Sequence, residues 1–287
     1  MSATWTPDRR QRGHYDRAPS SPRVVAISRI ASVHSDVCVE RQSPTGDRGQ
    51  RWGGVSGEGS VFSVTTTGVE KLLHSFGGTS DGVQPWAGLI DVKGTLYGTT
   101  LSGGTNGWGT VFSVTTSGKE TVRYSFKGST KNDGQNPYAA LIYVNYVNGK
   151  LYGTTTGGGF CRSASQGCGT VFATTLSGKE SVFYSFKGDD GDLPEAALLN
   201  INGTLYGTTE YGGGNYDDGT VFEILPSGKE RVLHSFAPAS FGDGQSPYAG
   251  LIKVKDALYG TTTFGGSGHC GSSGSSGGCG TVFSITP

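Results

Sequence analysis

The sequence predicts an all-β fold, a β-propeller-like array of four to five four-stranded blades. The first observation behind this prediction is a repeat. The residues GTVFSVTTSGKETVRYSF at 109–126 recur almost unchanged at 169–186 and 219–236, and more weakly at 59–76. The second is a shorter motif, LYGTT, which begins at Leu96, Leu151, Leu205 and Leu258. A repeat period of 50 to 61 residues indicates one supersecondary unit stacked on copies of itself.

Each repeat contains four candidate strands, as in residues 139–142, 150–155, 170–172 and 181–186. These segments are rich in Val, Thr, Tyr and Phe and are separated by glycine-marked turns, a pattern typical of strands. Four short antiparallel strands in every repeat predict the blade of a β-propeller. A β-helix would need much shorter repeats, and a helical solenoid would need a 3.6-residue hydrophobic period that this sequence lacks.

The number of blades depends on how the ends of the array pair. The last repeat stops after its third strand, at Pro287. The strand at 71–76 could supply the missing outer strand and close the ring, which would hide two sheet edges and give four blades. A degenerate first blade built with residues 24–27 would instead give five. The sequence is compatible with both the four-blade and the five-blade arrangement.

Residues 1–57 differ from the rest of the chain, so we divide it into a tail at 1–57 and a repeat domain at 58–287. Nine of the twelve arginines lie in the tail, whereas the first lysine is Lys71, and no repeat motif precedes Gly59. The opening residues lack the apolar stretch of a secretory signal peptide. We therefore expect the tail to be either irregular or a mis-assigned start, with a leader and earlier repeats lost upstream.

The composition argues against nucleic acid and a lipid bilayer as partners. The formal net charge is zero and only 16% of the residues are charged, so the sequence gives no sign of the basic face that nucleic acid requires. Apolar residues occur in runs such as Leu89-Ile90, far below the roughly 18 residues that span a bilayer. The sequence contains no GxSxG, HExxH or Walker-type motif, and we expect neither a cofactor nor a metal. We expect a monomer whose partner is a glycan or a surface protein.

Strand order brings the variable loops together. In a propeller blade the first strand lies nearest the axis, so the loop between blades leaves on the same face as the loop between strands two and three. These are the Asp-Gly loops and the glycine-rich SGG loops, whereas the turns of the opposite face, such as 92–94 and 116–118, are short. Binding residues concentrate on loops held by a rigid scaffold, so this face is the predicted working surface.

Two pairs of cysteines bracket insertions in equivalent loops. Cys161 and Cys168 lie between strands two and three of one repeat, and Cys270 and Cys279 occupy the matching loop two repeats later. Each pair is predicted to close its loop as a disulfide. Zinc is the alternative, but the spacings are not those of a CxxC site. Disulfides would place the protein in an oxidising, extracytoplasmic compartment, secreted or at the cell surface, with Cys38 left over.

The Asp-Gly loops supply the candidate ligand-binding residues. Their carboxylates, amides and rings suit hydrogen bonding to sugar hydroxyls and stacking on a sugar ring. The candidates are Asp81, Gln84, Trp86, Asp133, Gln135, Tyr138, Asp192, Asp243, Gln245 and Tyr248. The structural interpretation is that Asp-Gly forms a turn, Pro fixes φ and the ring packs where the chain re-enters the core. Because the motif is repeated, we favour this structural interpretation and expect at least one of the three rings to be mostly buried.

One repeat departs from this pattern. Its Asp-Gly loop carries Glu195 in place of the ring, and its next loop adds Glu210, Asp217 and Asp218, so that seven carboxylates between 189 and 218 share one face. Glycoside hydrolysis uses paired carboxylates, and crowding of like charges raises the pKa of one of them. Glu195, Glu210 and Asp217 are therefore weak candidates for catalysis. A solvated acidic loop is the commoner explanation of such a charge run.

The motifs GTVF, SGKE, YSF, DGQNPYAALI and LYGTT recur in order over about residues 59–287. In this they resemble the GloVer tandem repeat, found in the choice-of-anchor bacterial surface proteins. The resemblance implies export and a β-propeller-like array, and it implies no activity for named residues. The chain shows neither a leader nor the C-terminal anchor of that pattern, which leaves attachment to a cell surface open.

Three hypotheses of function follow. The first is a secreted or surface-exposed β-propeller that binds a glycan or a protein without catalysis. The second is a carbohydrate-active enzyme, similar to a glycoside hydrolase, that uses the acidic repeat at 189–218. The third is a structural or adhesive array without a discrete site. Binding by repetition predicts similar sites in every repeat, whereas catalysis predicts a single divergent one.

Overall fold

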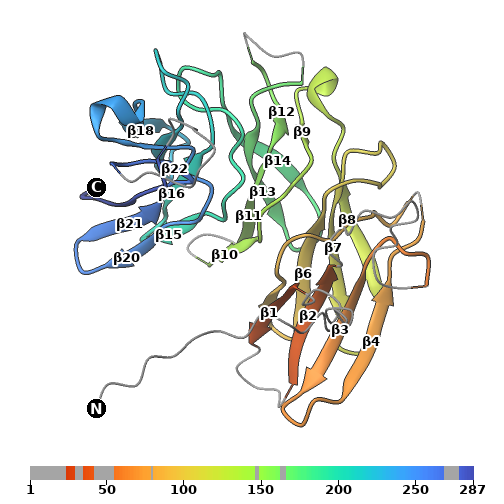
Figure 1. Cartoon of the computed structure of the whole chain (residues 1–287). Helices are drawn as coiled ribbons and strands as arrows, with labels where there is room; N and C mark the ends of the chain where they lie inside the picture. Colours follow the sequence, from red (N-terminus) through yellow and green to blue (C-terminus); the bar gives the residue numbers. More distant parts are fainter. Residues whose placement is uncertain are drawn as a thin grey trace, which may run out of the picture.

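The computed structural model describes residues 24–29, 35–41, 55–78, 80–145, 149–161, 166–267 and 278–287, the first two ranges by their backbone only. These residues form strands, turns and two short 3₁₀ helices, η1 (Ser129–Lys131) and η2 (Ala239–Phe241), and they contain no α-helix. The fold is therefore all-β, as predicted (Figure 1).

The strands of the described ranges form five main antiparallel sheets that follow one another along the chain. The first contains β1 (Val24–Arg29), β2 (Ser35–Arg41), β3 (Ser60–Thr65) and β4 (Glu70–Ser75). The second contains β5 (Ile90–Val92), β6 (Thr95–Thr100), β7 (Thr110–Thr115) and β8 (Glu120–Ser125). The third contains β10 (Ile142–Val144), β11 (Lys150–Thr155), β13 (Thr170–Thr175) and β14 (Glu180–Ser185).

The last two sheets continue the same order. The fourth contains β15 (Leu199–Ile201), β16 (Thr204–Thr209), β17 (Thr220–Ile224) and β18 (Glu230–Ser235). The fifth has three strands, β20 (Ile252–Val254), β21 (Ala257–Thr261) and β23 (Val282–Ile285). Strand β10 contacts both β5 and β15, so the short first strands of three consecutive sheets lie side by side.

The ends of the array agree with one of the two predicted arrangements. Strand β4 pairs with β3, so residues 71–76 belong to the first sheet and do not complete the last one. A tight hairpin joins β3 to β4 and favours this local pairing over the alternative in which residues 71–76 complete the last sheet. Residues 24–29 instead supply the first strand of the first sheet. Strands β1 and β2 are regular structure within residues 1–57, where we expect an irregular or mis-assigned tail; the domain boundary at residue 57 stays a prediction.

The LYGTT motif places a leucine and a glycine in the core of each of the last four sheets. In the second sheet Leu96 is fully buried, and Gly98 lies against the Phe112 ring. A Cβ atom at Gly98 would come within 2.8 Å of that ring, so only glycine fits. The same contact with a phenylalanine ring recurs at Gly153, Gly207 and Gly260.

The two threonines of the motif connect strands and sheets through their hydroxyl groups. Thr99 donates to the carbonyl oxygen of Ala139, just before the first strand of the next sheet, at 3.4 Å. Thr100 and Thr110, on neighbouring strands, share a hydrogen bond of 2.8 Å. Equivalent pairs are Thr155–Thr170, Thr209–Thr220 and Thr262–Thr281. Burying a hydroxyl group without a hydrogen-bond partner would destabilise the fold by about 1–3 kcal/mol. Each pair avoids this cost because the two threonine hydroxyls bond to each other.

Pairs of phenylalanine rings build the core between successive sheets. Phe126, directly after β8, is fully buried and meets Phe172 of β13 edge to face, with 5.0 Å between ring centroids. The other pairs have the same geometry: Phe76–Phe112, Phe186–Phe222 and Phe236–Phe283. Each pair joins the end of one sheet's outer strand to the third strand of the next, so each of these four interfaces buries the same contact.

The two kinds of variable loop lie side by side in each repeat, as the strand order predicts. Small sheets join them: β9 (Gly134–Gln135) pairs with β12 (Gly157–Gly158), and β19 (Gly244–Gln245) pairs with β22 (Phe264–Gly265). Single bridges join Val83 to Ser102 and Asp192 to Tyr211. In Figure 1 the β9–β12 pair lies beyond the upper end of the sheet that contains β11, β13 and β14. We call the surface formed by these Asp-Gly and glycine-rich loops the loop face.

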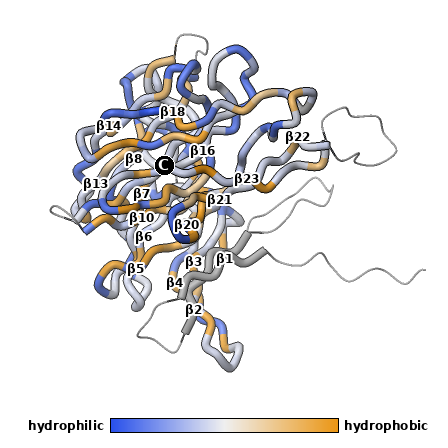
Figure 2. The backbone as a smooth tube through the Cα atoms, turned by 90° about the vertical axis from the view of Figure 1, so that its left-hand side faces the viewer, coloured by the Kyte–Doolittle hydropathy of each residue, from blue (hydrophilic) through white to orange (hydrophobic). Residues whose placement is uncertain are grey.

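Hydrophobic residues occur in short runs within the strands, separated by hydrophilic turns and loops (Figure 2). This alternation fits small sheets that bury one face against a neighbouring sheet. Within the part of the chain that the structure describes, no helix is long and apolar enough to cross a membrane.

Replacing Phe126 by Ala should lower the free energy of unfolding by about 3–5 kcal/mol, because it leaves a cavity at the interface of two sheets. Equilibrium unfolding in urea measures the change. The matched control is Phe241→Ala, since that ring is 68% exposed, and it should cost less than about 1 kcal/mol. Equal losses in the two variants would contradict the role assigned to the phenylalanine pairs.

Candidate functional site

Three rings and one carboxylate from four different Asp-Gly loops come together on the loop face. Trp86 and Tyr138 are stacked, with ring centroids 5.3 Å apart and planes inclined by 30°. Tyr138 meets Tyr248 edge to face at 6.2 Å. The Tyr248 hydroxyl lies near the carboxyl of Glu195, the residue that replaces the ring in the acidic repeat, and near Tyr138. We call Trp86, Tyr138, Glu195 and Tyr248 the aromatic cluster.

A strained backbone turn positions each member of the aromatic cluster. Each follows the proline of its loop, and the residue before that proline has a left-handed φ angle: 61° at Gln84, 57° at Asn136, 53° at Leu193 and 52° at Ser246. Such conformations cost about 1–3 kcal/mol and persist where the surroundings hold them. The backbone N–H of Asn136, for example, donates to the Trp108 carbonyl of the preceding sheet at 2.9 Å. Gln84 therefore contributes its backbone to the same kind of turn.

The rings of the cluster lie against one another. Trp86 and Tyr138 are partly buried, and Tyr248 is 42% exposed. None of the three is fully buried, so the rings differ from the phenylalanines of the core. This arrangement leaves ring surface open to a ligand while fixing the orientation of each ring.

The Glu195 carboxyl lies in a partly desolvated environment. Burial raises its pKa, the charge of Glu210 adds to the increase, and the hydrogen bond from Tyr248 opposes it. Burial and the hydrogen bond to Glu195 raise the pKa of Tyr248. The phenol is therefore protonated at neutral pH and can act as a donor, and the Glu195 carboxyl lies beside the rings as a potential acceptor.

The other acidic candidates of the divergent repeat lie near Glu195. Burial raises the pKa of Asp192, and the charge of Asp217 adds to it. The pKa of Tyr211 is raised first by Glu210 and then by burial, with further contributions from Asp217 and Glu195. Asp217 also accepts a hydrogen bond of 2.7 Å from a backbone N–H of its own loop. The structure thus brings Glu195, Glu210 and Asp217 within electrostatic range of one another.

The aspartates of the Asp-Gly loops are directed to the outer strand of the preceding sheet. Asp133 is only 5% exposed, and it accepts hydrogen bonds from the Tyr124 hydroxyl (2.6 Å) and the Lys127 backbone N–H (2.8 Å). The equivalent pairs are His74–Asp81, Tyr184–Asp190 and His234–Asp243, at 3.4, 2.6 and 3.0 Å. These contacts favour the structural interpretation of Asp81, Asp133 and Asp243.

The glutamines of two Asp-Gly loops stiffen the loop face. Gln135 is buried and donates from Nε2 to Gln166 Oε1 at 2.8 Å. Gln245 donates to Asp218 of the preceding sheet at 2.7 Å. Both amides are therefore engaged within the protein, which supports a positioning role for them.

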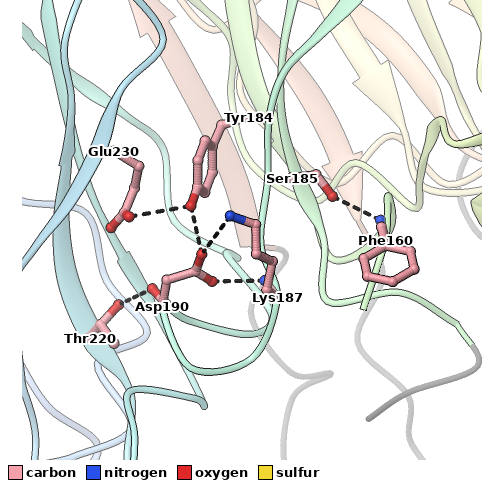
Figure 3. A network of polar contacts seen from close by, with 7 residues as sticks. All are labelled: Phe160, Tyr184, Ser185, Lys187, Asp190, Thr220 and Glu230. Carbon is pink, nitrogen blue, oxygen red and sulfur yellow. Dashed lines mark hydrogen bonds and ion pairs between the residues drawn. The ribbon is translucent and has the colours of Figure 1, made fainter. Parts of the chain in front are cut away.

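A second group of carboxyls lies between successive outer strands, and Figure 3 shows one copy of it. The Tyr184 hydroxyl donates to Asp190 at 2.6 Å, and its oxygen lies 3.3 Å from Glu230 Oε2. The Lys187 backbone N–H also donates to Asp190, at 2.7 Å. One hydroxyl proton serves one acceptor at a time, so the nearer Asp190 takes it and Glu230 is favoured in its protonated form.

The pKa values of these glutamates follow from that environment. Burial raises the pKa of Glu230 to about 7, and the charge of Asp190 adds to the increase. Glu120 and Glu180 occupy equivalent places, and burial raises the pKa of each to about 7 as well. We did not predict this group from the sequence, although the repeated SGKE motif carries all three glutamates.

The first predicted disulfide is present: Cys161 and Cys168 are bonded, with 5.1 Å between their Cα atoms. Cys279 is disulfide-bonded as well. Its predicted partner, Cys270, lies outside the described residues, as does the side chain of Cys38. Among the residues that the structure describes, no group of three or more His, Cys, Asp or Glu side chains could hold a metal ion.

The loop face also carries exposed rings that the sequence interpretation missed. They are Trp108, Phe160, Tyr211, Tyr216, Phe241 and Phe264. Tyr216 and Phe241 contact each other across neighbouring loops, with centroids 5.5 Å apart. An available signal was an aromatic residue inside a loop otherwise made of Gly, Ser, Asn and Asp.

The chain matches a known repeat family. A family model described as the Gloeobacter/Verrucomicrobia repeat covers residues 49–273. No curated protein sequence matches the chain.

Distant likenesses exist among solved structures. One is the xyloglucan PUL GH43B of Bacteroides ovatus, with 17% identity and a TM-score of 0.40 over 83% of this chain and 47% of that one. Another is a GH93 α-L-arabinofuranosidase of Fusarium graminearum in complex with arabinobiose, with 11% identity and a TM-score of 0.47 over 88% and 72%. A luciferin-regenerating enzyme gives 13% identity and a TM-score of 0.48 over 93% and 79%. The chain spans about half the length of the first of these proteins, and we transfer no residue role from any of them.

Stability should fall as the pH rises from about 5 to about 8, because Glu120, Glu180 and Glu230 take up protons on folding. A carboxyl whose pKa is higher in the folded than in the unfolded state stabilises the fold fully at pH values below its unfolded pKa of 4.5. This stabilisation is lost as the pH rises through the folded pKa of about 7. Calorimetry across this range should show a decrease in Tm of at least roughly 3 °C. The triple variant with Gln at these positions keeps the neutral form and should flatten most of the slope. An unchanged slope in that variant would reject the assignment.

Proposed function

Because the chain belongs to the Gloeobacter/Verrucomicrobia repeat family, we propose that it is an extracytoplasmic β-propeller module that binds a glycan on its loop face. The resemblance to the GloVer repeat is confirmed by this family match. The sheets are the blades, and the aromatic cluster is the binding site. Export, monomeric state and a glycan partner are parts of this proposal.

The observation that carries the proposal is the convergence of Trp86, Tyr138 and Tyr248. These rings come from three loops that lie far apart in the sequence, yet they contact one another in one cluster with the Glu195 carboxyl beside them. Flat rings beside a hydrogen-bond acceptor suit the apolar face and the hydroxyl groups of a pyranose. The phenylalanines already form the core between the sheets, so the fold does not depend on these partly exposed rings for its core. Their exposed surface is available to a ligand.

The oxidised cysteines support a location outside the cytoplasm. The Cys161–Cys168 bond closes the loop between β11 and β13, and Cys279 is also oxidised. Structural disulfides persist in oxidising compartments outside the cytoplasm. The family and the disulfides together support a secreted or surface-exposed protein.

A second candidate function is glycoside hydrolysis by the acidic repeat. Burial raises the pKa of Glu195, and Glu210 is close enough to add to that increase. A carboxyl with a raised pKa beside a second carboxyl is the arrangement of a general acid and its partner. This candidate shares its location with the proposed binding site, so the two can be separated by experiment.

Truncating Tyr248 to Ala should weaken binding of a glycan identified by array screening about fivefold, because one stacking contact is worth about 1 kcal/mol. Trp86→Ala should have a larger effect. Tyr248→Phe keeps the ring but removes the bond to Glu195, so a smaller loss in this variant separates stacking from hydrogen bonding. Isothermal titration measures affinity, and a thermal melt checks folding. Unchanged affinity in both Ala variants would reject the cluster as the site.

If the acidic repeat is catalytic, incubation with the bound glycan should release reducing sugar, and Glu195→Gln should lower the rate at least about 100-fold while binding persists. Glu210→Gln should act similarly. A chain that binds the glycan and releases no sugar over a long incubation is a binding module, and the enzyme hypothesis is then wrong.

A further inference from the structure

A groove on the loop face, separate from the aromatic cluster, has the chemistry of a site for an acidic sugar. It lies between the β6–β7 loop and η1, with a volume of about 640 Å³, and it is lined by Trp108, Lys127, Lys131, Asn106 and three Ser or Thr side chains. Ligand pockets of small molecules typically measure about 300–1,000 Å³. The groove is therefore large enough for one or two sugar units.

The indole of Trp108 is held in place within this groove. Its Nε1 edge lies against the backbone of Gly128, where an added Cβ would come within 2.8 Å of Nε1. Gly128 has φ 78°, so a larger residue there would be strained and would also displace the ring. The Trp108 carbonyl accepts a hydrogen bond from Asn136 at 2.9 Å. A ring that is fixed at its edge and 36% exposed offers a platform on which a sugar ring can stack.

The charged side chains of the groove are positive. Two lysines are its charged lining residues, and the charge of Lys127 also acts on Glu180, whose pKa it lowers. The Lys127 ammonium lies 5.6 Å from the centroid of the Tyr124 ring. Asn106 donates to the Phe126 carbonyl at 3.1 Å, so the loop that carries Trp108 is tied to the end of β8. A fixed ring beside two ammonium groups suits a sugar that carries a carboxylate.

Two of the residues that line the groove differ from those at the same places in other repeats. The residue directly before the Gly-Thr-Val-Phe motif is Trp108 here, but Cys168, Asp218 and Cys279 stand at that position in later repeats. The place of Lys131 in η1 is taken by Phe241 in η2. These differences show that Trp108 and Lys131 are not part of the repeated scaffold, so both positions are available for binding.

We infer that this groove binds an acidic sugar, with Trp108 stacked on a pyranose ring and Lys127 and Lys131 paired with the carboxylate of a uronic acid. This second site goes beyond the proposed function and stands whether or not the aromatic cluster binds a glycan. The contact is electrostatic in part, so its affinity depends on ionic strength.

The test is titration of the full chain with trigalacturonate, with neutral galactotriose and with inorganic phosphate. Trigalacturonate should bind at least about tenfold more tightly than galactotriose, and its affinity should fall when the salt is raised from about 0.05 M to about 0.5 M. Trp108→Ala should weaken trigalacturonate binding about tenfold. Lys131→Gln should reduce both the affinity and its salt dependence.

The controls separate this site from the aromatic cluster. Tyr248→Ala should leave trigalacturonate binding unchanged. A thermal melt of Lys131→Gln should match the parent chain, because that side chain lies at the surface, and a melt of Trp108→Ala checks that this variant is folded. Equal binding of galactotriose, full competition by phosphate or an unaffected Trp108→Ala variant would each overturn the inference. Loss of trigalacturonate binding in Tyr248→Ala would assign the acidic sugar to the aromatic cluster and also overturn it.

Discussion

The edge-to-face contact between a phenylalanine at the end of one sheet and a phenylalanine in the next is the interaction on which the array depends. It recurs at 5.0–5.1 Å in four interfaces, and all but one of the rings involved are buried. A short four-stranded sheet cannot bury its own hydrophobic face, so stacking on a neighbour supplies its core. The contact fixes the orientation of one sheet against the next. It thereby also sets the relative positions of the Asp-Gly and glycine-rich loops that the sheets carry.

The loops follow from this stacking through a second set of repeated residues. The aspartate of each Asp-Gly loop is bonded to the outer strand of the preceding sheet, and the residue before the proline is held in a left-handed conformation. Both features anchor the loop at the interface between two sheets. The repeated aspartates and the residues before the prolines are thus engaged in the scaffold. The rings that follow the prolines, and side chains that occur once such as Trp108 and Glu195, are left for the sites that we propose.

The carboxyl groups of the chain fall into three environments with different chemistry. The loop aspartates accept short hydrogen bonds and anchor the sheets. The SGKE glutamates lie half-buried beside those aspartates, and burial raises their pKa to about 7. Glu195 lies instead beside the rings of the aromatic cluster, where it accepts a hydrogen bond from a tyrosine. Environment and not residue type therefore decides which carboxyl can serve a ligand.

The sequence by itself determined the repeating unit, its strands, the pairing of Cys161 with Cys168 and the placement of both loop types together, because these depend on turns and alternation within about 60 residues. Tertiary structure alone decided that Trp86, Tyr138, Glu195 and Tyr248 meet, since their contact depends on the rotation between stacked sheets. It also decided that residues 35–41, a segment without a recognisable motif, pair with β3. No short window of sequence encodes such relations, because they arise from packing between segments that are far apart along the chain.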